Sequence, residues 1–151
     1  MPHSFGQIYL HIVFSTKHRY PYLQDRELRS RLHAYLSSAC HGMKCPSLIV
    51  GGVADHVHIL CRLSRTITVA DLLLRLKKES SKWIKQQDPA MDSFYWQEGY
   101  GAFSTGPKHL EPLRRYIANQ EAHHQTEDFQ SEYRRLLAAY NLEYDERYVW
   151  D

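Results

Sequence analysis

Residues 55–63 read D-H-V-H-I-L-C-R-L, and at 56–59 histidines alternate with apolar residues. Alternation with a period of two predicts a β-strand. Side chains at positions i and i+2 of a strand point to the same face. Val57 and Ile59 are therefore expected to face a layer of helices, and His56 and His58 to project together from the open face of the sheet.

The segments around this strand predict the rest of the fold. The helix that follows Thr68 has the clearest pattern, with Leu72, Leu76 and Ile84 on one side and lysines on the other. Strands are predicted at 7–15, 44–51, 55–63 and 94–103, and helices at 25–41, from Thr68 to near Pro89, at about 109–124 and at about 127–140. The order β-α-β-β-α-β followed by two helices is the ferredoxin-like split β-α-β arrangement of the α+β class: a four-stranded antiparallel sheet with two helices on one face, here with additional C-terminal helices.

Length and composition bound the possibilities further. A chain of 151 residues that is 43% hydrophobic is expected to fold as one domain spanning 1–151. No apolar run is long enough for a transmembrane helix, and the N-terminus lacks the apolar core of a signal peptide. The three cysteines form no C-x-x-C pair, which favours free thiols in a cytoplasmic protein.

Charge is distributed unevenly along the chain. The net charge is +2, yet residues 62–85 carry +5 and residues 121–151 carry −5. The near-neutral net charge argues against a histone-like protein, which binds nucleic acid through a large overall positive charge. The basic first half still permits a polyanion on one surface, although a solvated basic helix explains the same pattern.

The pair His56 and His58 is the first candidate for chemistry. Neutral imidazole is a good ligand for divalent metals, and two imidazoles on one strand face form a preformed pair. Asp55 directly precedes them and can orient an imidazole or shape a turn. The alternative is a pair of half-exposed histidines on a solvated face, because H-x-H is a short pattern in a chain with ten histidines.

The second candidate lies in the helix predicted at 109–124. Helical spacing places Tyr116 and Gln120 on the same side as the apolar Leu113 and Ile117. A buried amide needs hydrogen-bonding partners. Gln120 either bonds a neighbouring backbone group beside a packing tyrosine, or its oxygen coordinates a metal beside a reactive phenol one turn away. The residues alone leave both interpretations open.

Taken together, these motifs resemble a known family, the single-tyrosine HUH transposases of bacterial insertion sequences, which are TnpA-like enzymes acting on single-stranded DNA. The name HUH stands for His-hydrophobic-His. The resemblance covers nearly the whole chain and rests on H-I-V-F-S-T-K-H-R at 11–19, D-H-V-H-I-L at 55–60, K-K-E-S-S-K-W at 77–83, F-Y-W-Q-E-G-Y at 94–100 and Y-I-A-N-Q at 116–120.

The resemblance implies roles for particular residues. Tyr116 would be the nucleophile, and His56, His58 and Gln120 would hold one divalent metal, Mg²⁺ or Mn²⁺. Attack by the tyrosine would give a 5′-phosphotyrosine and a free 3′-OH, and the covalent bond would allow rejoining without ATP. The substrate would be single-stranded DNA with hairpins near the element's ends.

Two further expectations concern partners. Members of the family work as homodimers with composite active sites, and a long aromatic edge strand at 94–103 would favour pairing with a second copy. Lys17 and Arg19, in the basic loop after the first strand, are candidates for contacts with DNA phosphates, although an exposed loop without a ligand is a serious alternative.

Three other functions remain possible. A domesticated, repeat-associated relative would use the same chemistry without mobility. A replication- or relaxase-type nickase would also use HUH chemistry, but such enzymes are usually longer. A non-catalytic RRM-like module shares the fold and stacks bases on sheet aromatics, for which Tyr9 and the aromatics of 94–103 could serve.

Overall fold

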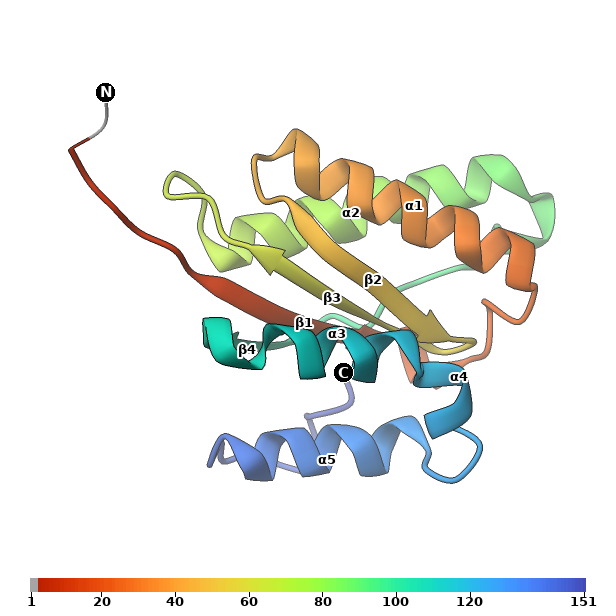
Figure 1. Cartoon of the computed structure of the whole chain (residues 1–151). Coiled ribbons are helices and arrows are strands. Elements are labelled where there is room, and N and C mark those ends of the chain that lie inside the picture. Colours follow the sequence, from red (N-terminus) through yellow and green to blue (C-terminus); the bar gives the residue numbers. More distant parts are fainter. Residues whose placement is uncertain (1–2) are drawn as a thin grey trace.

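The computed structural model of the protein describes residues 3–151 and contains one four-stranded sheet (Figure 1). The strands lie in the order β2-β3-β1-β4, and each neighbouring pair is antiparallel. Their bounds are β1 Tyr9–Ser15, β2 Ser47–Val53, β3 His56–Arg62 and β4 Gly101–Thr105. This order is that of the ferredoxin-like arrangement, so the predicted α+β fold class is confirmed.

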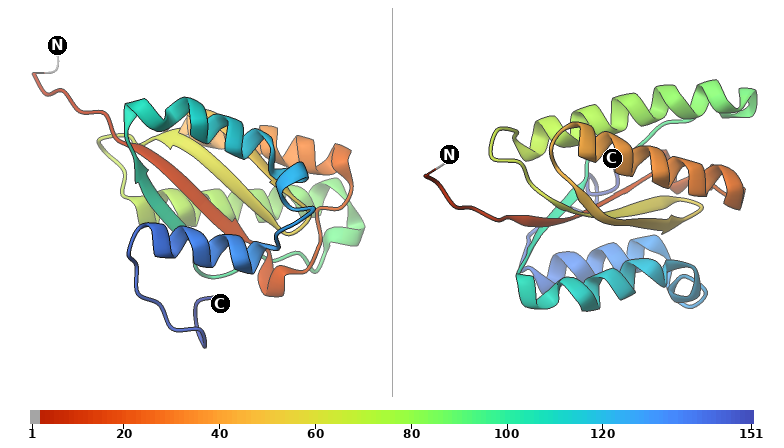
Figure 2. Two further views of the ribbon diagram at one scale, coloured as in Figure 1. Left: turned by 60° about the horizontal axis from the view of Figure 1, so that its bottom comes forward. Right: turned by 45° about the horizontal axis from the view of Figure 1, so that its top comes forward.

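Helices cover both faces of the sheet. α1 and α2 lie on one face, and α3 and α5 lie on the other, with the short α4 between them in the chain (Figures 1 and 2). Their bounds are α1 Arg26–Gly42, α2 Val69–Gln87, α3 Leu110–Ala118, α4 Gln120–His123 and α5 Phe129–Ala139. The expectation of an open second face was wrong, because the C-terminal helices fold back over it.

Single turns of 3-10 helix complete the described part of the chain: η1 Lys17–Arg19, η2 Pro89–Met91 and η3 Pro107–His109. Among residues 3–151, no helix is both long and apolar enough to cross a membrane.

Local capping explains where three of the helices begin. The side chain of Asp25 accepts a hydrogen bond from the backbone N–H of Glu27 at the start of α1 (2.9 Å). Thr68 caps α2 through Asp71 N–H (3.0 Å), as its position before the apolar pattern predicts. Asp128 caps α5 in the same way.

The face under α1 and α2 holds the larger apolar core of the molecule, here named the dry core because its members are almost all hydrophobic. Alternate residues of β1 and β3, among them Ile12, Phe14, Val57 and Ile59, are fully buried against the apolar stripes of the two helices. Burial of this much apolar surface is the main source of stability in a domain of this size. The prediction that Val57 and Ile59 face helices is confirmed.

The aromatic segment before β4 differs from the prediction. A strand was expected at 94–103, but regular pairing with β1 begins only at Gly101. Phe94 and Trp96 turn their rings into the core under α2, and only Trp96 makes an isolated bridge, to Thr16. The edge strand is therefore short, and the argument for dimerisation from a long aromatic edge does not hold.

Candidate active site

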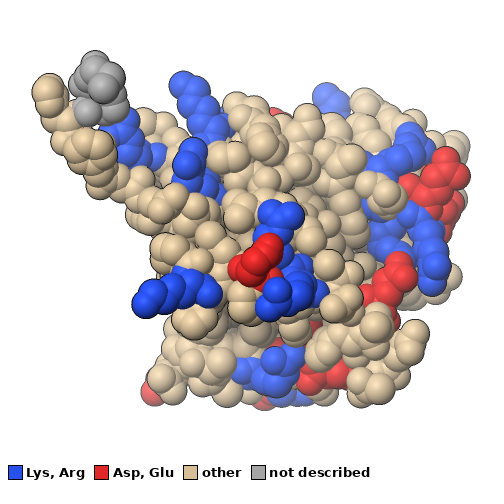
Figure 3. Space-filling view, viewed as in Figure 1, with Lys and Arg blue, Asp and Glu red and all other residues tan. Residues whose placement is uncertain are grey.

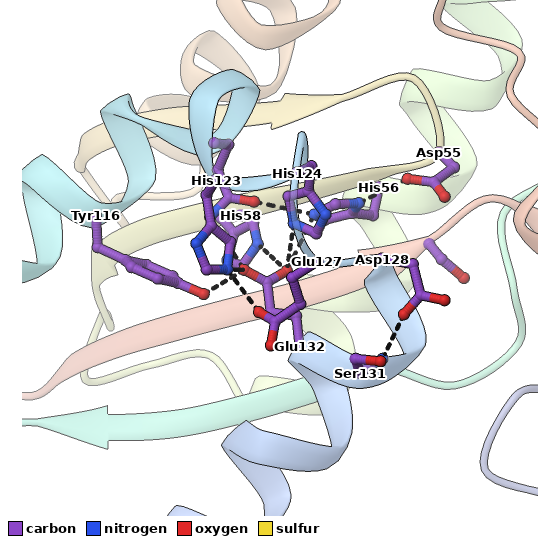
Figure 4. A network of polar contacts seen from close by, with 12 residues as sticks. Asp55, His56, His58, Tyr116, His123, His124, Glu127, Asp128, Ser131 and Glu132 are labelled. Carbon is purple, nitrogen blue, oxygen red and sulfur yellow. Dashed lines mark hydrogen bonds and ion pairs between the residues drawn. The ribbon is translucent and has the colours of Figure 1, made fainter.

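The two histidines of β3 lie in the interface between the sheet and the C-terminal helices (Figure 4). Both are fully buried. The Nδ1 atom of His56 lies 2.7 Å from Asp55 Oδ1, and the Nδ1 atom of His58 lies 2.7 Å from Nε2 of His11 on β1. With each Nδ1 occupied, both Nε2 atoms are turned toward a common centre.

The carboxylate of Glu132, on α5, occupies that centre and is fully buried. Its Oε1 lies 2.9 Å from His124 Nε2, 3.1 Å from His58 Nε2 and 3.2 Å from His56 Nε2. Its Oε2 accepts a hydrogen bond from Gln120 Nε2 (3.1 Å). The amide oxygen of Gln120 lies 3.1 Å from His56 Nε2, so Gln120 bridges the histidine and the carboxylate.

Tyr116 enters the same cluster from α3. Its hydroxyl donates to Oε2 of Glu132, and Nη2 of Arg135 donates to the phenol oxygen (2.9 Å). Its ring lies edge-on to His58 at 5.9 Å between centroids. Unlike the fully buried histidines, Tyr116 is half-buried, so its oxygen sits where the buried cluster meets solvent.

Burial and hydrogen bonding push the pKa values of the histidines apart. Burial alone would lower the pKa of His56, but its hydrogen bonds with Asp55 and Glu132 outweigh this and raise the pKa to about 9. Burial lowers the pKa of His58 to about 4 and that of His11 to about 3. With His58 neutral, its Nε2 donates to Glu132 and its Nδ1 accepts from His11.

The two acidic groups at the centre are perturbed as well. Burial would raise the pKa of Glu132, but hydrogen bonds from the surrounding imidazoles hold it well below the usual range. Burial raises the pKa of Tyr116, and the hydrogen bond to the carboxylate of Glu132 raises it further, while Arg135 opposes the change. Glu132 is therefore ionised and Tyr116 carries its proton at neutral pH.

Gly51 fixes the distance between α3 and the sheet. It pairs with His58 in the β2–β3 ladder, directly under the helix. A Cβ atom at this position would lie 2.6 Å from the carbonyl oxygen of Ile117. Because Gly51 has no side chain, α3 can lie directly on the backbone of β2. The contact is with Ile117, the residue that follows Tyr116.

The structure brings the four predicted site residues together within one chain. Tyr116 and Gln120 reach the histidine pair although the predicted helix over 109–124 is interrupted at Asn119, where α3 ends and α4 begins. The break leaves Gln120 fully buried and turned toward His56. Tyr116 therefore lies beside the histidines of its own chain.

Sequence reasoning missed His11, His124 and Glu132. Two of them carried a signal: His11 shares a strand face with Tyr9 and Val13 rather than with the core residues, and Glu132 falls within the apolar stripe of α5. A carboxylate inside an apolar stripe needs partners as much as a buried glutamine does.

Lys17 and Arg19 lie in η1, at the end of β1 nearest to the site. The backbone N–H of Thr16 donates to Asp55 O (2.9 Å), which ties this turn to the residue before His56. The exposed side of α3 adds Arg114 and Arg115, and Figure 3 shows Lys and Arg side chains spread over this face of the molecule with Asp and Glu side chains between them. Basic side chains thus lie on η1 and α3, while the acidic Asp55, Glu127 and Asp128 lie around the cluster itself.

The cluster fits a divalent metal. One donor atom each from His56, His58, His124 and Glu132 lies within 4.8 Å of all the others. Imidazole and carboxylate donors suit Mn²⁺ and similar first-row metals. The contacts of Asp55 and His11 with the Nδ1 atoms leave both Nε2 atoms facing the centre, and these Nε2 atoms would give up the protons that they direct at Glu132 when they bind a metal.

A ferredoxin-like sheet with a tyrosine facing a histidine pair is the arrangement of a Y1 transposase. The chain belongs to the family described as "Transposase IS200 like", which matches residues 4–120. The protein is thus a transposase, a DNA-binding and DNA-cleaving enzyme. His124 and Glu132 lie beyond the matched residues.

Two solved structures share this fold. A protein of Deinococcus radiodurans R1, described as a candidate transposase, has a TM-score of 0.62 and 19% sequence identity over 80% of this chain and 95% of its own. A REP-associated tyrosine transposase bound to a REP hairpin has a TM-score of 0.50 and 8% identity over 80% of this chain and 68% of its own. No curated protein sequence matches the chain.

Proposed function

We propose that the protein cleaves and rejoins single-stranded DNA at insertion-sequence ends through a 5′-phosphotyrosine intermediate, with the help of a divalent metal. The observation that supports this most directly is the convergence of Tyr116, His56, His58 and Gln120 in a chain of the IS200-like family. The resemblance to the HUH transposases assigns the nucleophile to Tyr116 and the metal ligands to the other three residues.

In the first step, the phenol oxygen of Tyr116 attacks the scissile phosphorus. A phosphorus–O5′ linkage is retained, the phosphorus–O3′ bond breaks, and the 3′ oxygen takes a proton from solvent to become a free 3′-OH. The hydrogen bond to Oε2 of Glu132 orients the phenol, and the phenol proton is released to solvent as the new oxygen–phosphorus bond forms. A second DNA 3′-OH then attacks the phosphotyrosine, which restores the tyrosine and needs no ATP.

Arg135 and Glu132 have opposite effects on the nucleophile. The carboxylate raises the pKa of Tyr116 and holds its proton, whereas the guanidinium, 2.9 Å from the phenol oxygen, favours the phenolate. Once the phenol has lost its proton, the hydrogen bond from Arg135 still reaches the tyrosine oxygen. Arg135 is therefore assigned to stabilise the tyrosine oxygen as its negative charge develops.

Mg²⁺ or Mn²⁺ would be held by His56, His58 and Gln120, the set that the resemblance implies, or by the two histidines with Glu132 and His124. When bound, the metal would offset the charge of the scissile phosphate and orient it for in-line attack. Three imidazoles and a carboxylate favour Mn²⁺ over Mg²⁺.

The proposed substrate is single-stranded DNA with hairpins near its ends. The REP-associated transposase of similar fold is bound to a hairpin, which supports this choice. A homodimer with composite active sites follows from the resemblance alone. It is tested by sedimentation and by mixing Tyr116→Phe with His58→Ala: composite sites would regain cleavage on mixing, and sites within one chain would not.

Covalent trapping tests the function itself. Labelled single-stranded DNA incubated with protein and Mn²⁺ should give a DNA-linked band on a denaturing gel, and Tyr116→Phe should abolish both the band and cleavage. Tyr133→Phe is the matched control, because Tyr133 is a buried tyrosine of α5 in the adjoining apolar cluster. Cleavage without a covalent band would point to attack by water and contradict the proposal.

A further inference from the structure

A groove on the other side of the sheet has the properties of a nucleic-acid surface. It runs between α2 and residues 95–100, with a volume of about 380 Å³. Tyr95 and Tyr100 line it together with Lys77 and Lys78. It lies on the side of the dry core, outside the cluster around Glu132.

Tyr95 stands out among the aromatics of this segment. Its neighbours Phe94 and Trp96 are buried, but the side chain of Tyr95 is 58% exposed. The ammonium of Lys85, on α2, lies 4.6 Å from its ring centroid, and that of Lys17, in η1, lies 5.9 Å from it. An exposed aromatic ring between two lysines offers a base a stacking surface and offers the flanking phosphates positive charge.

The groove continues this pattern away from Tyr95. The ammonium of Lys77 donates to the backbone carbonyls of Gln97 (2.9 Å) and Glu98 (3.0 Å), which holds the loop in place, and lies 5.6 Å from the ring of Tyr100. Glu98 is the one acidic side chain among the lining residues. Lys78 also lines the groove, and the ammonium groups of Lys17 and Lys85 lie over the ring of Tyr95, so cationic side chains outnumber the one carboxylate of the lining, which favours a polyanion.

Backbone hydrogen bonds place the groove close to the catalytic cluster. Consecutive residues of one turn connect the two, because Thr16 N–H donates to Asp55 O (2.9 Å) and Lys17 N–H donates to Tyr95 O (2.8 Å). Two strand spacings, about 10 Å, thus separate the backbone at Tyr95 from that before His56. A few nucleotides of an extended strand span such a distance around the end of the sheet.

We propose that this groove binds the unpaired DNA strand that leads to the active site, with one base stacked on Tyr95 and its phosphates on Lys17 and Lys85. The inference rests on the proposed function for the identity of the DNA and adds a subsite to it. Stacking on the exposed ring, from which the flexible ammonium groups can move to the phosphates, suits a flexible single strand better than a duplex, whose bases are already stacked.

Binding of fluorescent oligothymidylate, measured by anisotropy, tests the proposal without any cleavage. Tyr95→Ala should weaken binding about 5- to 150-fold, the loss expected for one base–aromatic stack, whereas Tyr95→Phe should bind like the wild type. Lys85→Gln should lower the slope of log K against log salt by about 0.7, the value for one phosphate contact with a single strand. Tyr148→Ala is the matched control, because Tyr148 is 63% exposed beside Arg147 but lies outside the groove.

Unchanged affinity of Tyr95→Ala, or an equal loss for a duplex, would overturn the groove proposal. Covalent trapping reports on the proposed function separately, since these variants leave Tyr116 and the histidines intact. A DNA adduct with no dependence of binding on Tyr95 would refute the groove alone. Binding that depends on Tyr95 without any adduct would refute the cleavage mechanism and leave the groove as a binding site.

Discussion

The two faces of the sheet are built from alternate residues of the same strands, yet they differ in chemistry. Toward α1 and α2, Ile12, Val57 and Ile59 belong to the larger apolar cluster. Toward α3 and α5, His58 and Glu132 form a polar cluster beside a smaller apolar one. Burying charged groups costs free energy unless they are paired, so the second face gives up stability to hold reactive groups in place.

The largest effect on stability is expected on the dry face. Leu76→Ala, at a fully buried position of α2, should lower the free energy of unfolding by about 2–5 kcal/mol, because it removes buried methyl groups and leaves a cavity. Leu74→Ala, in the same helix but 65% exposed, should change it by less than about 0.5 kcal/mol. Urea unfolding measures both, and equal effects would show that the two positions are not distinguished by packing.

The polar face should make stability depend on pH in metal-free protein. The pKa of His56 is raised from 6.5 to about 9, so its contribution is complete below pH 6.5 and is lost as pH rises through about 9. The loss amounts to about 3 kcal/mol. Below pH 6.5 stability should fall as well, because His58 and His11, whose pKa values are lowered, must take up protons when the protein unfolds at low pH.

Unfolding in EDTA across this pH range checks the expectation of a maximum near pH 6.5. His56→Gln should remove the decline on the alkaline side. A steady rise in stability from pH 6.5 to 9 would contradict the assigned protonation of His56.

Metal binding should stabilise the protein through the polar face, where the candidate ligands lie. Mn²⁺ at a hundred times its Kd should raise the free energy of unfolding by about 2.7 kcal/mol, and EDTA should reverse this. His58→Ala should abolish the effect, whereas Leu74→Ala should keep it. The set with Gln120 predicts that Gln120→Ala loses the stabilisation by Mn²⁺, and the set with Glu132 and His124 predicts that Glu132→Gln loses it. Stabilisation by Mn²⁺ that survives in His58→Ala would exclude both ligand sets.

The smallest effect is expected at the basic turn. Lys17→Gln should lower the salt slope of single-stranded DNA binding by about 0.7, the value for one phosphate contact. Lys108→Gln is the control, because Lys108 follows β4 at the opposite end of the sheet, where Thr105 pairs with Tyr9. Equal slopes for the two variants would remove Lys17 from the DNA-binding surface.

The fold was largely predictable because its periodic segments are long. Alternation over 55–63 and the apolar stripe after Thr68 reflect burial directly, and the structure follows them to within a few residues. The prediction of a strand at 94–103 was wrong because aromatic residues favour strands but also fill cores. Phe94 and Trp96 are buried in the core. The covered second face was missed because it depends on where the C-terminal helices dock, which no local pattern encodes.

The site was predictable only in part. His56, His58, Tyr116 and Gln120 stand in recognisable motifs, and the structure brings them together. Glu132 does not stand in a short motif, and it reaches the histidines through a contact between residues 74 positions apart. Its place inside an apolar stripe was the only sign of a buried carboxylate, and its partners could not be named without the fold.

Gly51 makes the reacting groups vulnerable to mutation at a position that carries no functional group. Any side chain there would press on Ile117 and push α3, with Tyr116, away from the histidines. Among random variants, substitutions of Gly51 should appear with the inactive but folded proteins, as if the glycine took part in the reaction. Within this family, a glycine five positions before the first histidine would mark chains whose tyrosine helix lies equally close to the sheet.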